Sequence, residues 1–186
     1  MKIKLQKPWC PLVFLLMLTA CGKTIKFTEE VQLPGSDKTI ILERSEVFEP
    51  RMVRLSLKQT YIRSELSIVG SKLPRWKARL HPIYFGALPE DGAGYLLVAT
   101  IRNSIGCYER GKPNSPYVVF VSGQQEWREI PMPKYLDGRT ANLLLQMESR
   151  PPGNDTLSKE KIKELNRLVG VLPDEQTIQL STRFGC

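Results

Sequence analysis

Apolar and polar side chains alternate along much of the N-terminal half of the chain, as they do in strands that bury one face. The alternation holds from 25 to 33 and resumes at 39–42, after the Pro-Gly-Ser-Asp sequence at 34–37. Apolar runs on both sides of a turn-forming tetrapeptide predict a β-hairpin. Alternating runs at 53–57 and 61–69 predict two more half-buried strands.

The centre of the chain contains two continuous apolar runs, at 94–101 and 117–121. The first is too short to cross a bilayer as a helix, so we expect a central strand. The second is rich in β-branched and aromatic residues, and the Ser-Gly-Gln-Gln sequence at 122–125 predicts a turn after it. Trp127 and Ile130 then lie on the returning strand, where we expect Trp127 to pack in the hairpin.

Proline and glycine predict two connections. Residues 73–79 contain Pro74, which favours a connecting segment that leads to the apolar residues 83–85. Residues 107–116 contain one glycine and two prolines, a composition that favours an ordered loop over a helix.

One helix is predicted near the C-terminus. Ser158 can cap its first turn, and Leu157 and Ile162 are spaced to form a hydrophobic staple. Gly170 and Pro173 are typical of residues that end a helix.

These elements predict a mainly β fold of the α+β class, with antiparallel β-hairpins or a meander and one C-terminal helix packed on the sheet. Residues 177–182 predict a short final strand. Residues 140–147 fit a helix or a strand equally well, and both assignments stay open.

The first twenty residues follow a different pattern, in which lysines precede an apolar run at 11–18 and small residues follow it. This order is typical of a secretory signal and is too short to span a bilayer. The sequence Leu18-Thr19-Ala20-Cys21 resembles the lipobox of bacterial lipoproteins. The resemblance implies cleavage after Ala20 and acylation of Cys21, and two or three acyl chains on one residue hold a small domain at a membrane. An ordinary cleaved signal followed by a free thiol is the alternative.

We therefore expect residues 1–20 to be a cleaved signal peptide, residues 21–23 to be the lipidated N-terminus, and residues 24–186 to form one periplasmic domain. In lipoproteins of Gram-negative bacteria, an Asp directly after the acylated cysteine favours the inner membrane. Because Gly22 and Lys23 follow Cys21 here, the expected location is the cell envelope, anchored in the outer membrane and facing the periplasm. In a Gram-positive host the same signal would place the domain outside the cell membrane.

The charge of the chain is positive but dispersed. Lys and Arg number 27 against 19 Asp and Glu, a formal net charge of +8, and three of the lysines lie in the signal segment. No dense basic block of the kind that binds nucleic acid is present, so we expect no nucleic-acid partner. Arg75, Lys77 and Arg79 surround Trp76, which makes this cluster a candidate surface contact for anionic lipid or a polyanionic glycan. A solvated surface loop is the alternative.

The four cysteines reduce to one expected pair. Cys10 lies in the signal and Cys21 carries the lipid, which leaves Cys107 and Cys186. In an oxidising compartment these two predict a disulfide that fixes the C-terminal end. A metal pair or a catalytic thiol is the alternative, but a metal site needs more Cys or His ligands than this chain offers. We therefore expect no metal and no cofactor.

The middle of the chain resembles a group of uncharacterised proteobacterial lipoproteins, in which a hydrophobic strand precedes a cysteine loop, a Gly-x-Pro-Asn turn and an aromatic strand. The group has no known activity, so the resemblance implies an envelope location and a β-rich fold but no catalytic residue. The matching residues are 95–101, Cys107-Tyr108, Gly111-Lys112-Pro113-Asn114, 117–120 and Trp127.

Residues suited to catalysis are sparse. His81 is the one histidine and is followed by proline, so we expect a structural or surface role for it and no nucleophilic triad. The carboxylate pairs at 29–30 and 90–91 could serve glycan hydrolysis, but neighbours on a strand point to opposite faces. We expect a non-enzymatic binding or structural module, anchored to the lipid bilayer, with an envelope protein or cell-wall glycan as partner. The alternative is an envelope hydrolase that acts on glycan through dispersed carboxylates.

Overall fold

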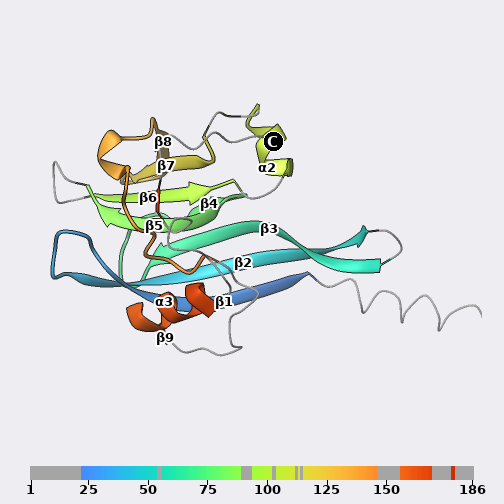
Figure 1. Ribbon diagram of the computed structural model, residues 1–186, viewed down its shortest axis with the longest axis horizontal. Coiled ribbons are helices and arrows are strands. Elements are labelled where there is room, and N and C mark those ends of the chain that lie inside the picture. Colours follow the sequence, from blue (N-terminus) through green and yellow to red (C-terminus); the bar gives the residue numbers. More distant parts are fainter. Residues whose placement is uncertain are drawn as a thin grey trace, which may run out of the picture.

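The computed structural model describes residues 22–53, 56–88, 94–101, 104–111, 113, 115–145, 156–168 and 177–178. These residues form two β-sheets and a C-terminal helix, which confirms the predicted α+β fold (Figure 1). Sheet A has the strand order β4-β3-β2-β1-β9, and sheet B has the order β5-β6-β7-β8. The strands are β1 (Lys23–Gln32), β2 (Thr39–Val53), β3 (Ser56–Ile68), β4 (Trp76–Ala78), β5 (His81–Ala87), β6 (Tyr95–Thr100), β7 (Tyr117–Ser122), β8 (Trp127–Ile130) and β9 (Thr156–Leu157). The helices are α2 (Ser104–Glu109), the 3-10 helix η1 (Lys134–Leu136) and α3 (Lys159–Leu168).

Sheet A is built around a long antiparallel meander. The predicted first hairpin is confirmed: β1 pairs with β2, and the Leu33 N–H donates to the Lys38 carbonyl oxygen across the turn at 2.9 Å. The two alternating runs predicted at 53–57 and 61–69 differ from the structure, because β2 runs to Val53 and one continuous strand, β3, begins at Ser56. The short β9 adds to β1 in parallel, so the sheet is mixed at that edge.

Sheet B is an antiparallel meander that is buried on both faces. Leu97 of the central strand β6 packs toward sheet A, while Leu96 and Val98 face the opposite cluster, which contains Leu136 and Ile178. This double burial explains why β6 is continuously apolar in sequence, and it confirms the predicted central strand. The predicted return of the chain through β8 is confirmed too, and Trp127 packs against the core as expected.

Three successive leucines join the separate parts of the core. Leu143 lies in the cluster between the two sheets, Leu144 in the cluster under α3, and Leu145 in the cluster on the far face of sheet B. All three are at most 2% exposed. The described part of 140–147 therefore adopts neither a helix nor a named strand, although Thr140 forms an isolated bridge to Thr177.

The C-terminal helix is confirmed in position and packing. The Lys161 N–H donates to the Ser158 hydroxyl at 3.3 Å, as expected of an N-cap. Leu157 and Ile162 belong to one apolar cluster with Phe27 of β1, as the staple requires. The helix thus covers the β1 edge of sheet A (Figure 1). None of the described helices is long and apolar enough to cross a membrane.

Two predicted connections are wrong in part. Residues 76–78 of the connection expected at 73–79 form β4, which pairs with β3, because Pro74 precedes the strand and leaves its ladder intact. The loop expected at 107–116 begins instead as the last turn of α2. The helix ends just before Gly111, which has a φ of +68° and whose N–H donates to the Tyr108 carbonyl oxygen. The glycine and prolines of this segment therefore follow the helix, and they predicted a loop because they say nothing of the turn before them.

Candidate functional site

The predicted surface contact at Trp76 is wrong. Trp76 is 2% exposed and packs edge-to-face against Phe120 of sheet B, with ring centroids 5.5 Å apart. The pairing of β4 with β3 places Trp76 beside Leu66, on the buried face, and leaves Arg75 and Lys77 exposed. Successive side chains of a strand point to opposite faces, so the tryptophan is buried while its basic neighbours are exposed. The sequence pattern did not predict a strand here.

The cations around Trp76 are matched by acidic side chains. Arg75 Nη1 lies 3.4 Å from Glu65 Oε2, and Lys77 Nζ lies 3.7 Å from Glu65 Oε1. Arg79 pairs with Glu109 of α2. The hydrogen bond from Arg63 lowers the pKa of the Glu65 carboxyl, helped by the nearby cations. This surface is therefore a network of exposed ion pairs, which has little unbalanced charge to offer an anion.

The other predicted site residues are only partly described. Cys107 is buried, at 1% exposure, and is disulfide-bonded. Cys21 and Cys186 lie outside the described residues, so no disulfide joins two described residues and the pairing of Cys107 with Cys186 stays a prediction. His81 stacks on the ring of Tyr61 at 3.8 Å between centroids, consistent with the structural role expected for it.

A row of polar side chains that the sequence analysis did not identify as a site crosses the buried face of sheet A. Glu29 of β1, Arg44 and Glu46 of β2, and Ser64 of β3 are all 0% exposed. Together with Tyr61 of β3 we call them the buried polar row. Their signal in the sequence is charge at the apolar positions of an alternating strand, since position 29 shares the period of 25, 27 and 31.

Arg44 is the centre of the buried polar row. Its Nε donates to Glu46 Oε1 at 2.7 Å, and its Nη1 lies 3.5 Å from Glu29 Oε2. Nη1 also donates to the Leu144 carbonyl oxygen at 2.8 Å, while the Leu144 N–H donates to Glu29 Oε1 at 2.7 Å. The guanidinium and the Glu29 carboxylate thus hold both backbone groups of the residue that joins the sheets to α3.

The row continues toward the second sheet through hydroxyl groups. Ser64 Oγ donates to Glu46 Oε1 at 2.7 Å, and the Tyr61 hydroxyl lies 2.9 Å from Ser64 Oγ. The Tyr61 hydroxyl donates to the Leu80 carbonyl oxygen at 2.7 Å, just before β5 begins. Burial raises the pKa of Tyr61 above its ordinary value, so the phenol stays protonated and remains a donor.

Two buried carboxyl groups share one guanidinium, and this imbalance perturbs the row. Burial raises the pKa of Glu29 against the opposing effects of Arg44 and the Leu144 N–H. Burial alone would lower the pKa of Arg44, but the charges of Glu46 and Glu29 outweigh it and raise that pKa. One oxygen of each carboxyl, Oε2, accepts no hydrogen bond from a described residue. Because every charged member of the row is closed to solvent, it is suited to fixing the fold and not to acting on a substrate.

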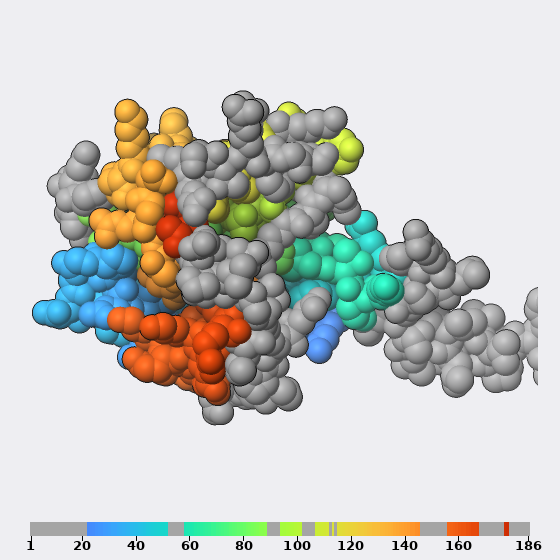
Figure 2. Space-filling model, viewed as in Figure 1, coloured from blue at the N-terminus to red at the C-terminus, as the bar shows by residue number. Residues whose placement is uncertain are grey.

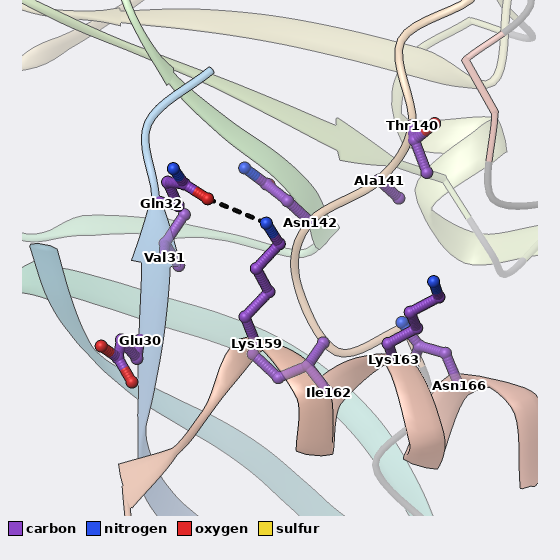
Figure 3. Close-up of a pocket in the computed structure, with 10 residues that line it drawn as sticks. All are labelled: Glu30, Val31, Gln32, Thr140, Ala141, Asn142, Lys159, Ile162, Lys163 and Asn166. Atoms are coloured by element: carbon purple, nitrogen blue, oxygen red, sulfur yellow. Dashed lines mark hydrogen bonds between the residues drawn. The ribbon is translucent and has the colours of Figure 1, made fainter. Parts of the chain in front are cut away.

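An open cavity lies at the C-terminal end of β1, between β1, α3 and the segment before Leu143 (Figure 3). Its volume is about 270 Å³, slightly below the range of about 300–1,000 Å³ typical of small-molecule sites. The wall is mostly apolar. The lining residues are Glu30, Val31, Gln32, Thr140, Ala141, Asn142, Lys159, Ile162, Lys163 and Asn166.

The polar groups around this cavity differ in what they can still bind. Asn142 exchanges two hydrogen bonds of 2.8 Å with the Phe85 backbone, and Asn166 bonds the backbone of Leu143 and Leu145. Both amides are therefore occupied.

The two lysines of the cavity come from successive turns of α3. Lys159 Nζ donates to Gln32 Oε1 at 2.8 Å, as the dashed line in Figure 3 marks. Lys163 makes no ion pair or side-chain hydrogen bond with the described residues and points to the upper part of the cavity (Figure 3). The cavity is thus a mostly apolar hollow, and the cation at its rim has no partner among the described residues.

In comparisons with known proteins, no family model, curated protein or solved structure matches this chain. The resemblance to a lipoprotein group therefore stays a prediction. The described residues contain no group of three or more His, Cys, Asp or Glu side chains placed to hold a metal ion.

Proposed function

We propose that this protein is a lipid-anchored envelope lipoprotein whose folded domain is a non-enzymatic binding module. The cavity beside α3 is its binding site, and its partner is an envelope protein that inserts an apolar side chain next to an acidic one. The observation that carries the proposal is the mostly apolar wall of the cavity, with Lys163 at the rim paired to no described residue. Energetic anchors of protein interfaces are side chains that fill pockets of this kind.

A protein partner suits this cavity better than a cell-wall glycan does. A sugar presents many hydroxyl groups, each of which needs a hydrogen-bond partner when it leaves water. The amides of Asn142 and Asn166 are already used by the backbone, and Gln32 Oε1 already accepts from Lys159. Val31, Ala141 and Ile162 supply an apolar part of the wall, which a sugar cannot use for hydrogen bonds. One large apolar side chain fits the volume and needs no such partners.

A glycan hydrolase is the second candidate, and the geometry gives it less support. Glu29 and Glu46 are the buried carboxyl pair of sheet A, but both are closed to solvent and held by Arg44. Among the described residues, Glu30 is the one carboxylate that lines the cavity, whereas glycosidases use two that face each other across the sugar.

Crosslinking from the cavity tests the binding proposal. With a photoreactive amino acid at Gln32, we expect one discrete protein adduct in native membranes, identified by mass spectrometry. Lys163→Glu should lower the adduct yield about fivefold, because reversal of a rim charge costs about 1 kcal/mol of attraction. Lys38→Glu, an equal charge change in the β1–β2 turn, should leave the yield unchanged. An adduct with a small molecule or a glycan, or a yield that is insensitive to Lys163→Glu, would contradict the proposed partner.

Replacement of Cys21 tests the anchor. In Cys21→Ser cells we expect loss of labelled palmitate from the protein and accumulation of the uncleaved precursor, because the thiol is the acylation site. Cys107→Ser is the matched control, and it should keep both the label and the mature mass. Palmitate that persists on Cys21→Ser protein would show that the anchor is elsewhere.

A further inference from the structure

The β2–β3 hairpin extends past the rest of sheet A at one end. Lys23, the first residue of β1, pairs with Phe48, but β2 continues to Val53 and pairs with β3 from Ser56 onward. We call residues 49–53 and 56–59 the hairpin tip. Figure 1 shows it projecting beyond the start of β1, and the cyan and teal atoms in Figure 2 project in the same direction.

The lipid anchor of the proposed function attaches at the base of this tip. Gly22, the residue that follows Cys21, lies against β2: a Cβ atom on it would meet the Phe48 carbonyl oxygen at 2.9 Å. No linker therefore separates β1 from the residue next to the anchor. Acyl chains on Cys21 would place the membrane beside the hairpin tip and away from the turn at Asp37.

The residues of the tip suit an anionic membrane surface. Arg51 and Lys58 are exposed and directly opposite each other, a like-charge pair that disfavours the strand pairing. Neither makes an ion pair with a described residue. The next rung of the ladder pairs Met52 with Leu57, two apolar residues. The two cations at the end of the hairpin suit an anionic bilayer surface, because each cation near such a surface adds attraction to the head groups.

We propose that the hairpin tip rests on the anionic phospholipid surface that holds Cys21, as a second membrane contact which orients the domain. This inference rests on the proposed anchor. The tip extends five residues past Phe48, about 16 Å at about 3.3 Å per residue. A head-group layer is only about 5–8 Å deep, so the hairpin lies inclined to the membrane normal.

Lipid crosslinking tests the contact in the acylated full-length product. The protein, with a photoreactive amino acid at Met52, is reconstituted in vesicles of phosphatidylcholine and phosphatidylglycerol. We expect phospholipid adducts at position 52 and none from the same probe at Asp37. Arg51→Glu with Lys58→Glu should lower the adduct yield about tenfold, since each cation near an anionic surface contributes attraction. Lys38→Glu with Lys72→Glu, the same charge change at the opposite end of sheet A, should have no effect.

The outcomes separate this contact from the anchor. Palmitate on Cys21 with no lipid adduct at position 52, or with equal adducts at positions 52 and 37, overturns the inference and leaves the anchor standing. The role of anionic lipid is overturned if the adduct yield is as high in vesicles of phosphatidylcholine alone as in the mixed vesicles. It is also overturned if charge reversal leaves the yield unchanged. Absence of palmitate on Cys21 overturns the proposed function first, and the tip contact with it.

Discussion

Arg44→Met should destabilise the protein by about 3–5 kcal/mol, measured as the free energy of unfolding in urea. The substitution leaves the carboxyl groups of Glu29 and Glu46 buried without their counter-charge. It also removes the donor to the Leu144 carbonyl oxygen, and an unpaired buried acceptor carries a further penalty. The loss concentrates at the point where sheet A, sheet B and α3 meet, so we expect one cooperative transition at lower urea.

The pH dependence of this loss identifies its cause. Burial already raises the pKa of Glu29, and without Arg44 this carboxyl group binds a proton still more readily in the folded state. Protonation removes the uncompensated charge, so the destabilisation by Arg44→Met should shrink as the pH falls from 7.5 toward 5. Arg63→Met is the matched control. Its ion pair with Glu65 is partly exposed, and the substitution should cost at most about 1 kcal/mol. Equal losses in the two variants would show that the buried charges are not what matters.

Trp76→Ala should cost about 3–5 kcal/mol of unfolding free energy, because it empties a space in the core between the two sheets. Trp76→Phe should cost clearly less. The Trp76 Nε1 has no hydrogen-bond partner among the described residues, so the smaller ring loses volume but none of the described hydrogen bonds.

Exposed neighbours on β4 provide the control for Trp76. Arg75→Ala and Lys77→Ala should each change the unfolding free energy by less than about 1 kcal/mol, because their ion pairs are solvated. If Trp76→Ala left the stability unchanged but weakened membrane or glycan binding, Trp76 would be a surface contact after all, and its burial in the core would be contradicted.

Sequence patterns predicted most of the elements whose burial shows in the order of apolar and polar residues along the chain. The first hairpin, the central strand β6 and the cap and staple of α3 depend on local signals: alternation, a turn tetrapeptide and spacing within one turn of helix. Such signals act between residues that are close in the chain, so they can be recognised without knowledge of the tertiary structure. The short strand β4 could not be recognised in this way, because three residues are too few to show an alternating pattern.

The candidate sites were less visible in the sequence. The charges of Glu29, Arg44 and Glu46 stand at apolar positions of their strands, but which of them meet depends on register between strands. The partner of Arg44 and Glu29 is a backbone unit at Leu144, about a hundred residues away in the chain. No local pattern encodes that contact.

By itself, the sequence determined the class of fold, the first hairpin turn, the start of α3 and the signal that predicts an anchor at Cys21, since each depends on short-range order of residue types. Only the tertiary structure decided that Trp76 is buried, that Leu143, Leu144 and Leu145 enter three different clusters, and that the start of β1 lies beside the hairpin tip. Those outcomes follow from strand pairing and from packing between distant segments, which set the direction and neighbours of a side chain whatever its local pattern suggests.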